Sequence, residues 1–345
     1  MTTKQASVEE PADPLLGQVL DGQWKLLERL GTGAMGSVFV AQDLRLARRV
    51  AVKVLNANAV TDEALARFDR EAKLMAQFDH ENLVPIHAVG RHQDLPFIVM
   101  KWVDGKSLFQ LSYEKGRPYT ALEAAHVVGQ LLAGLSHLHK NHVLHRDVKP
   151  SNVVVRADGH ATLLDFGVAR PPEGSNLTRD GAVVGTPRYM APEQVLGDTL
   201  DGRCDLYAAG VILYELLTFS TPFGENNDAK VMRAHLSQTP KDPREFNAGL
   251  SDAVVAVVQK AMAKHPGDRF ATAEEFRHSL DRAARGGALE AAPPPPVPLS
   301  KRLPALPQSV IQTLKTATLT RNPNWVFAAI AALGLGMIIR AAACG

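Results

Sequence analysis

The stretch that decides the fold is His145-Arg146-Asp147-Val148-Lys149-Pro150-Ser151-Asn152. Asp165-Phe166-Gly167 follows it thirteen residues after Asn152, and Gly185-Thr186-Pro187-Arg188-Tyr189-Met190-Ala191-Pro192-Glu193 comes next. Short runs of this kind, rich in charged, amide and glycine residues, carry information through their order and spacing. The fold that contains these runs therefore has to be inferred from the sequence around them.

A glycine-rich run, Gly31-Thr32-Gly33-Ala34-Met35-Gly36-Ser37-Val38, lies upstream between two runs with strand composition, 24–30 and 37–43. Glycines let the backbone approach phosphate groups and adopt φ values closed to other residues. The pattern alone also fits a dinucleotide-binding fold or a plain hairpin turn. A dinucleotide-binding fold requires a helix next, and here a second strand follows, which disfavours that fold.

Lys53 stands in the apolar strand Val50–Leu55, fifteen residues beyond Val38. A lysine in such a strand is either a charge on an edge strand or a buried functional ammonium, and in isolation the edge charge is the commoner case. Glu71 favours the second alternative, a buried functional ammonium at Lys53. It lies in segment 62–78, where apolar residues recur at helical spacing. Its alternatives are a solvated helix face beside Arg67, Arg70 and Lys73, or a carboxylate that pairs with Lys53.

The order of elements predicts an α+β protein with two lobes. Strand-like runs and one helix fill residues 24–100, and helical patterns dominate from residue 105 onward, notably over 120–140 and 205–219. Hydrophobic residues make up 46% of the 345 residues, enough for a substantial core. The net charge of +2 gives no indication of nucleic-acid binding.

Taken together, these motifs resemble the eukaryotic-type protein kinases and, within them, the bacterial Hanks-type Ser/Thr kinases. The resemblance covers about three-quarters of the chain, from Trp24 to near Arg282, with each motif in the family's order. It implies a kinase domain at 24–284, with a small lobe at 24–100 and a large lobe at 105–284. It also implies ATP and Mg²⁺ as cofactors, with Mn²⁺ as an alternative metal, and proteins as substrates.

The resemblance assigns a role to each matched residue. Asp147 would accept the proton of the substrate hydroxyl or orient it, and Lys149 would neutralise the moving γ-phosphoryl group. Asp165 and Asn152 would bind the metal ions, and Mg²⁺ makes a pair of close carboxylates such as Asp147 and Asp165 useful. The expected nucleotide-binding residues are Leu30, Gly31, Thr32, Gly33, Ala34, Met35, Gly36, Ser37, Val38, Lys53, Glu71, Lys101 and Val103.

Four further features follow from the resemblance. Met100 resembles the gatekeeper, so adenine would meet the Lys101 carbonyl and the Val103 N–H; many relatives have Glu at the position of Lys101, a departure that leaves a backbone contact unaffected. Lys149 and Thr186 resemble markers of Ser/Thr specificity and disfavour a tyrosine kinase.

Asp205 resembles the aspartate that braces the catalytic loop. Glu193 and Arg269 resemble a buried ion pair, although Arg269 could instead be a surface charge.

Arg146 precedes Asp147, and relatives with an arginine at this position are commonly controlled by phosphorylation of the activation segment, here 171–186. The resemblance therefore implies the same control, in which a phosphate would offer charge and acceptor oxygens to Arg146. Among the candidates in 171–186, Thr178 is favoured and Ser175 comes next, whereas Thr186 is expected to have a structural role. Relatives often carry two threonines in this segment, and here Asp180 or Ala182 occupies the second position.

The flanks of the expected domain differ from it in composition. Residues 1–23 predict a flexible N-terminus without the apolar core of a signal peptide. Residues 285–322 contain a Pro-rich run and predict a linker. Cys204 and Cys344 are far apart and fit a reducing cytosol. A homodimer is left open.

An apolar segment, Trp325–Ile339, follows the linker and is interrupted by Arg340. It is shorter than the ~20 residues of a usual membrane helix. A terminal tryptophan, an arginine able to reach the headgroups and basic residues upstream favour a single transmembrane helix at 324–344, which would leave the kinase domain cytoplasmic at the inner (plasma) membrane. The alternative is a helix packed on the kinase or on a partner. The basic residues are Lys301, Arg302, Lys315 and Arg321.

Three functions compete at this point. The first is an active Ser/Thr protein kinase that phosphorylates proteins, itself included, in bacterial signalling. The second is a pseudokinase scaffold, which is disfavoured because Lys53, Asp147 and Asp165 are all present. The third is a small-molecule phosphotransferase, which typically lacks the segment at 185–193.

Overall fold

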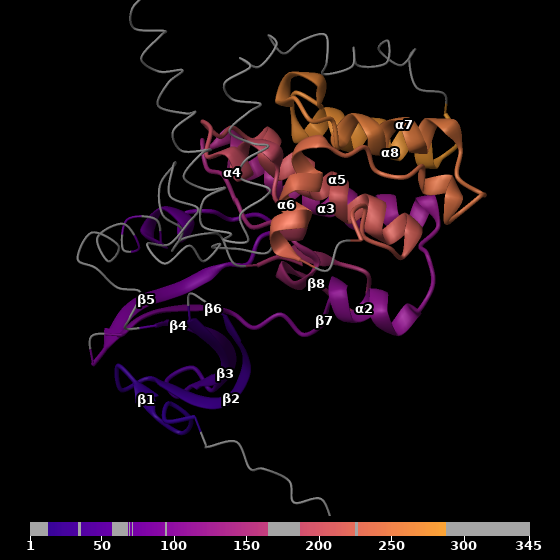
Figure 1. The fold of residues 1–345 in the computed structure, drawn as a ribbon. Coiled ribbons are helices and arrows are strands. Elements are labelled where there is room, and N and C mark those ends of the chain that lie inside the picture. The colour runs from indigo at the N-terminus through magenta and orange to yellow at the C-terminus, as the bar shows by residue number, and fades with distance from the viewer. Residues whose placement is uncertain are drawn as a thin grey trace, which may run out of the picture. The chain divides into compact units, whose positions relative to one another are not determined.

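The computed structural model describes residues 13–33, 36–56, 68, 70, 72–93, 95–164, 187–224 and 227–287. Within these residues the chain forms a strand-rich small lobe followed by a helical large lobe (Figure 1), which agrees with the predicted α+β arrangement. Residues 1–12 of the expected flexible N-terminus 1–23, residues 288–322 of the expected linker 285–322 and the apolar segment 324–344 lie outside the described residues.

The small lobe is built on one antiparallel sheet. In the described residues its strand order is β1-β2-β3-β4-β6-β5, with β1 at Val19–Leu20, β2 at Trp24–Gly33, β3 at Gly36–Asp43, β4 at Arg48–Leu55, β5 at Ile86–His92 and β6 at Leu95–Lys101. The sheet begins before the expected start at Trp24. Leu20 is buried in the small-lobe core and β1 pairs with β2, but two residues are too few for a periodic pattern to reveal.

Alternation along β4 gives each face of the sheet its own core. Val50, Val52 and Val54 face a cluster that contains Trp24, Phe39 and Phe97. Ala51 and Leu55 face the other way and belong to the main core. Because neighbouring side chains point to opposite faces, this period places Lys53 on the face of Ala51 and Leu55.

The predicted helix at 62–78 is described only in part. Residues 68, 70 and 72–75 are helical. Phe68, Ala72 and Met75 are buried in the same core cluster as Ala51 and Leu55, the residues on the Lys53 face of β4. The helical spacing predicted from the sequence is confirmed at these residues.

The large lobe is organised around α5, Arg203–Thr218, which is buried along nearly its whole length. Around it lie α2 (Leu108–Lys115), α3 (Ala121–Lys140), α4 (Pro192–Leu196), α6 (Asp228–Ser237), α7 (Asp252–Ala261) and α8 (Ala273–Ala284). Thr120 begins α3 with a capping box, in which its side chain accepts from the Glu123 N–H and Glu123 accepts from the Thr120 N–H. The two long predicted helices correspond to α3 and α5.

Residues 145–152, called the catalytic run below, lead into a small sheet of the large lobe. This sheet also includes residues that closely follow β6. It consists, in the described residues, of β7 (Lys106–Ser107), β8 (Val153–Val155) and β9 (Ala161–Leu163). The 3-10 helices η2 (Pro150–Asn152), η3 (Pro187–Tyr189), η4 (Pro243–Glu245) and η5 (Pro266–Asp268) complete the described elements.

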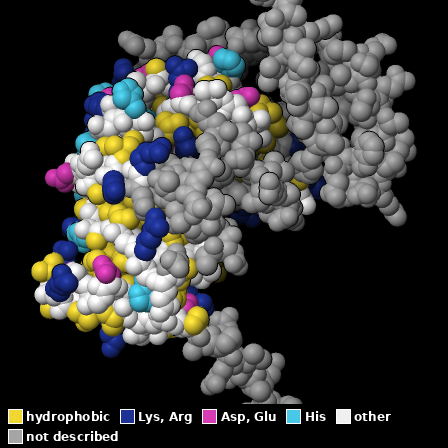
Figure 2. Space-filling model, turned by 90° about the vertical axis from the view of Figure 1, so that its left-hand side faces the viewer, with side chains coloured by type: hydrophobic (Ala, Val, Ile, Leu, Met, Phe, Trp, Pro, Cys, Tyr) yellow, Lys and Arg dark blue, Asp and Glu magenta, His cyan; other side chains and the backbone are white. Residues whose placement is uncertain are grey.

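The surface drawn in Figure 2 mixes the side-chain types. Lys and Arg side chains are spread over this face and interspersed with hydrophobic and acidic ones. On the part of this face that the structure describes, the positive charge is therefore not gathered into one continuous stripe.

Candidate active site

Three of the predicted site residues meet at Asp147. Asn152 donates from Nδ2 to the Asp147 carbonyl oxygen at 2.9 Å and to its Oδ2 at 3.2 Å. Lys149 Nζ lies 2.8 Å from the same Oδ2. The side chains of Asp147 and Lys149 are 18% and 22% exposed, whereas Asn152 is buried. The carboxylate is thus held from two sides and still reaches the surface.

Asp205 fixes the backbone of the loop that carries Asp147. Its Oδ2 accepts from the His145 N–H at 2.9 Å and its Oδ1 from the Arg146 N–H at 2.8 Å. Oδ2 also lies 2.8 Å from Nε2 of His139. Burial acts to raise the pKa of Asp205, but the hydrogen bond from His139, the electrostatic attraction to His139 and the hydrogen bond from the His145 N–H outweigh it and lower that pKa. The predicted brace is confirmed.

Arg146 adopts a left-handed backbone, with φ of 63°. This conformation is uncommon for a residue with a side chain and costs about 1–3 kcal/mol. Both of its peptide groups are held, because its N–H donates to Asp205 and its carbonyl accepts from Gln194 Nε2 at 3.1 Å. The strain is therefore maintained by α5 on one side and α4 on the other.

Leu164, the residue before Asp165, is hydrogen-bonded to residues 145–152 through both its N–H and its carbonyl. Its N–H donates to the Asn152 carbonyl at 2.7 Å, and its carbonyl accepts from His145 Nε2 at 2.9 Å. The Asp147 N–H donates to Nδ1 of His145 at 3.3 Å. These bonds assign the proton of His145 to Nε2. Asp165 itself lies outside the described residues, and its role as a metal ligand stays a prediction.

The glycine-rich run continues the β2–β3 hairpin. Gly31 pairs with Val38, Thr32 with Ser37 and Gly33 with Gly36, and the Thr32 and Ser37 hydroxyls are 3.1 Å apart. Gly36 has a φ of 150°, and a Cβ there would lie 2.1 Å from the Val54 carbonyl oxygen, so the hairpin requires glycine at this position. Leu30 is 49% exposed, and Ala34 and Met35 lie outside the described residues.

Lys53 is not on an edge strand, because β4 lies between β3 and β6, so that alternative is wrong. It pairs with Val38 on one side and Ile98 on the other. It is half-buried, on the face of β4 whose Ala51 and Leu55 share a core cluster with Phe68 and Ala72. Glu71 lies outside the described residues, and its pairing with Lys53 stays a prediction.

The hinge follows directly from β6. Met100 is buried, Lys101 ends the strand with an exposed side chain, and Val103 packs against the main core. The Lys101 N–H donates to the Pro85 carbonyl at 2.9 Å. A side chain that points to solvent supports the expectation that lysine at this position leaves the backbone contacts of the hinge unchanged.

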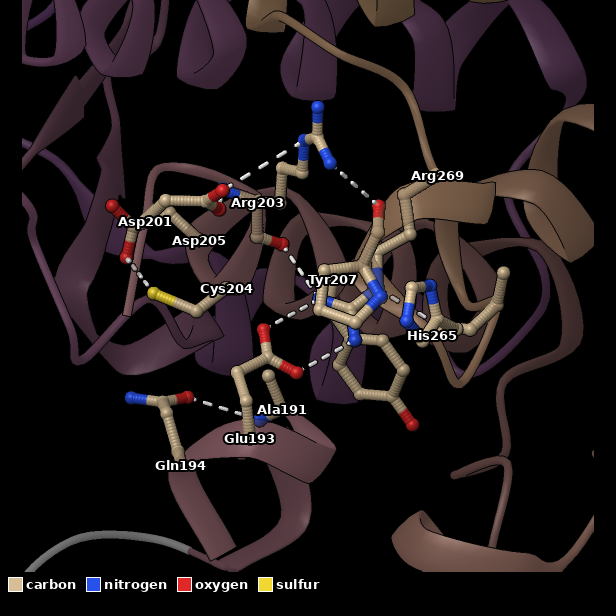
Figure 3. A network of polar contacts seen from close by, with 12 residues as sticks. Ala191, Glu193, Gln194, Asp201, Arg203, Cys204, Asp205, Tyr207, His265 and Arg269 are labelled. Atoms are coloured by element: carbon tan, nitrogen blue, oxygen red, sulfur yellow. Dashed lines mark hydrogen bonds and ion pairs between the residues drawn. The ribbon is translucent and has the colours of Figure 1, made fainter. Parts of the chain in front are cut away.

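Arg269 and Glu193 form the predicted buried pair (Figure 3). Nη1 donates to Oε1 at 2.6 Å and Nη2 to Oε2 at 2.7 Å. The remaining N–H groups of Arg269 donate to the carbonyls of Ala263, Arg203 and Lys264. All five donors of the guanidinium are used. Because its side chain is fully buried, the surface-charge alternative for Arg269 is wrong.

Polar partners that the sequence did not reveal support the segment after residue 186. His235 bonds through Nε2 to the Arg188 carbonyl at 3.0 Å, and its Nδ1 lies 2.8 Å from the Tyr207 hydroxyl. Burial and the charge of Lys264 lower the pKa of His235 to about 4. These partners lie 28 to 47 residues from His235 in the sequence, and a single sequence holds no signal that pairs them. The regulatory candidates Ser175 and Thr178 lie outside the described residues.

The described residues fit a nucleotide with Mg²⁺. Both Nδ2 hydrogens of Asn152 are donated to Asp147, so its Oδ1 is the end that suits a cation, and Mg²⁺ prefers oxygen ligands. Gly31, Gly33 and Gly36 offer backbone without side chains for a phosphate to approach. Oxygen donors from few side chains, completed by substrate phosphates, are the usual ligand set of Mg²⁺.

Sequence comparisons place this arrangement among known proteins. The family described as "Protein kinase domain" matches residues 24–280. Serine/threonine-protein kinase PknB of Mycobacterium tuberculosis is 39% identical over 279 residues, which cover 79% of this chain and 44% of that protein. Pkn1 of Myxococcus xanthus is 39% identical over 284 residues (81% and 40%), and PrkC of Bacillus subtilis is 33% identical over 270 residues (78% and 42%).

The chain thus spans less than half the length of these relatives. The matched region contains the whole catalytic run, its brace Asp205 and the Glu193–Arg269 pair. On this match and this geometry, the chain belongs to the protein kinase domain family.

Proposed function

We propose that this chain is a Ser/Thr protein kinase that transfers the γ-phosphoryl group of ATP to protein hydroxyls. The arrangement around Asp147 carries the proposal. Its carboxylate is held by Asn152 and Lys149, and Asp205 fixes the backbone on its N-terminal side. Phosphoryl transfer depends mainly on positioning and on neutralising charge, and a preorganised carboxylate with an adjacent ammonium provides both.

Each residue acts on a defined atom of the reactants. Asp147 orients the substrate hydroxyl and accepts its proton, and Lys149 neutralises negative charge on the group in transfer. Lys53, Glu71 and the glycine-rich run bind the ATP phosphates, and the Lys101 carbonyl and Val103 N–H bind adenine. Asn152 and Asp165 would hold Mg²⁺, or Mn²⁺ in its place, which supplies charge neutralisation at the phosphate oxygens.

The kind of acceptor follows from Lys149 and from the relatives. Lys149 lies beside Asp147, as expected for Ser/Thr specificity, and the relatives named above are called serine/threonine-protein kinases. A pseudokinase scaffold is not supported, because Lys53, Asp147 and Asn152 are retained and two of them are in contact. We propose 24–284 as the bounds of the kinase domain, with lobes at 24–100 and 105–284; the short strand β1, Val19–Leu20, adds to the small-lobe sheet ahead of Trp24.

The test is incubation of the full chain, in mild detergent, with ATP and Mg²⁺ and a generic Ser/Thr substrate. Asp147→Asn is the matched control, because it keeps the size and most hydrogen bonds of Asp147 and removes the base. General-base catalysis contributes about 10²–10⁴-fold, so the variant should lose at least that factor. Equal phosphorylation by both proteins, or none by the wild type while it binds ATP, would refute the proposal.

The same samples test the proposed regulation. Phosphate on Thr178, or next on Ser175, in the wild type alone would support a switch in which Arg146 binds the new phosphate. Absence of phosphate from residues 171–186 would refute it.

We also propose that residues 324–344 anchor the chain in the inner membrane, with residues 24–284 in the cytoplasm. Support comes from the apolar run after Trp325 and from the basic residues upstream. No helix in the described part of the chain is both long and apolar enough to cross a bilayer. The test is washing of membranes with carbonate, compared with a variant that ends at residue 290. Release of the full chain by the wash would refute the anchor.

A further inference from the structure

Two imidazole rings, those of His80 and His137, meet between the loop that precedes β5 and helix α3. Their ring centres are 5.1 Å apart, and the ring planes are inclined by 41°. The ring of Phe78 also contacts His137, edge to face, with the centres 5.7 Å apart. Both histidines are half-buried. The loop therefore rests on α3 through ring contacts, one of which joins two titratable groups.

The backbone of the loop makes a second contact with His80. The Asn82 N–H donates to Nδ1 of His80 at 3.1 Å, and the Leu83 N–H donates to the His80 carbonyl at 3.0 Å. Because Nδ1 is an acceptor here, the neutral ring carries its proton on Nε2. A second proton would occupy Nδ1 and remove the acceptor of the Asn82 N–H.

Neighbouring contacts limit how far the loop can move. Asn82 Nδ2 donates to the Ala161 carbonyl at 2.8 Å and to Gln130 Oε1 at 3.3 Å, and Leu83 is buried in the main core. These contacts involve amides, backbone and apolar groups, which do not titrate near neutral pH. An opening driven by the two histidines is therefore confined to residues 78–82.

The charges around His80 favour its neutral form in the folded protein. Burial and the electrostatic repulsion from His137 lower the pKa of His80 and outweigh the opposite effect of Glu81 and Asp79 on the same loop. From the β8–β9 hairpin, His160 reaches the Glu81 carbonyl with Nε2, at 2.9 Å. A lowered histidine pKa means that the unfolded chain takes up the proton more readily, so acid destabilises the folded loop.

We propose that His80 and His137 form a proton-sensitive latch between the loop that precedes β5 and α3. The latch is closed while both rings are neutral and opens as the pH falls below about 6.5, the range in which histidine side chains gain a proton. Two unit charges about 5 Å apart near a protein surface shift an equilibrium by about tenfold. Because the loop leads into β5, one connection between the lobes becomes dependent on pH.

Two substitutions keep the contacts of the latch and remove its titration. His80→Asn offers a side-chain oxygen to the N–H two residues on, the usual geometry of an asparagine turn, so Asn82 keeps an acceptor. His137→Phe keeps a ring against Phe78 and His80 and takes up no proton. The matched control is His278→Gln, which removes an exposed imidazole from α8.

The experiment measures hydrogen exchange of the full chain in mild detergent at pH 7.5 and pH 5.5, with exchange times scaled to the intrinsic rate at each pH. In the wild type and in His278→Gln, the protection of residues 78–84 should fall by about tenfold at pH 5.5. Helix α5 should keep its protection. In His80→Asn and His137→Phe, the fall over residues 78–84 should be less than about twofold.

Three results would overturn the latch. They are equal protection of residues 78–84 at both pH values in the wild type, the same loss in both latch variants as in the wild type, and a parallel loss in α5, which would mean unfolding of the whole domain. If His137→Phe does not fold, His80→Asn decides the matter. None of these readouts depends on phosphoryl transfer, so they are independent of the test of the proposed function.

Discussion

Arg269 donates two parallel hydrogen bonds to Glu193, at 2.6 and 2.7 Å, and the two side chains are 0% and 7% exposed. The pair joins the turn after η5 to the first turn of α4. Because α4 also bonds to the catalytic loop through Gln194, the pair holds in place an element that contacts the residue before Asp147.

Removal of one partner should be costly. Arg269→Met leaves Glu193 buried without its counter-charge, and breaking a buried pair in this way costs about 3–5 kcal/mol. The free energy of unfolding in urea measures the loss. Lys106→Met is the control, because the Lys106–Glu114 pair is exposed on both sides and is expected to contribute about 1 kcal/mol or less. Equal losses in the two variants would contradict the importance of burial.

Asp205→Asn should impair catalysis more than nucleotide binding. Asparagine keeps one acceptor oxygen and turns an amide toward a second backbone N–H, so the His145–Arg146 backbone must shift. A displacement of about 1 Å near the reacting groups costs on the order of 10²-fold in rate. We expect kcat to fall by about that factor and the Kd for ATP to change by less than about threefold. Unchanged kcat would show that the loop holds its conformation without the carboxylate.

Two glycines of the same hairpin should respond differently to alanine. Gly36→Ala puts a Cβ 2.1 Å from the Val54 carbonyl oxygen at a φ of 150°, whereas a Cβ at Gly31 meets no heavy atom within 4 Å. Residues forced into such backbone regions cost about 1–3 kcal/mol. Gly36→Ala should therefore lower the free energy of unfolding by at least that amount, and Gly31→Ala should leave it nearly unchanged. Similar urea midpoints for both variants would refute the steric account.

Lys264 predicts a pH dependence of stability. Burial and the charge of Arg269 lower its pKa to about 7, and its Nζ lies 4.6 Å from the centre of the Phe223 ring. Between this pKa and the unfolded value of about 10.4, the unfolded chain binds the proton and the folded protein does not. The contribution of Lys264 to stability should therefore rise with pH over that window, by up to about 1.4 kcal/mol per unit.

The comparison for this prediction is Lys264→Met, which removes the titrating group. The difference in unfolding free energy, wild type minus variant, should increase from pH 7 to pH 10. It should change little below pH 7, where the amine is protonated in both states. A difference that is flat over the whole range would contradict the lowered pKa.

Several features of this protein follow from the sequence by itself. Period-2 alternation in β4 places Lys53 on the face of Ala51 and Leu55, and apolar residues at helical spacing place Phe68 and Met75 in the core. Such patterns are local, because a residue's direction along a strand or helix is fixed by its neighbours in the chain. The spacing from Asp147 to Asn152 is local as well, and their contact follows from one turn of 3-10 helix.

Tertiary structure decided the partners of the buried polar groups. Asp205 bonds to a loop 59 and 60 residues away, and Asn82 meets Ala161 across 79 residues. The resemblance to a family could anticipate the first of these pairings. No local sequence pattern around Gln130 or His235 indicates which residues their side chains will contact. A hydrogen bond depends on atoms that the packed chain brings within about 3 Å, and that closeness is a property of the folded molecule alone.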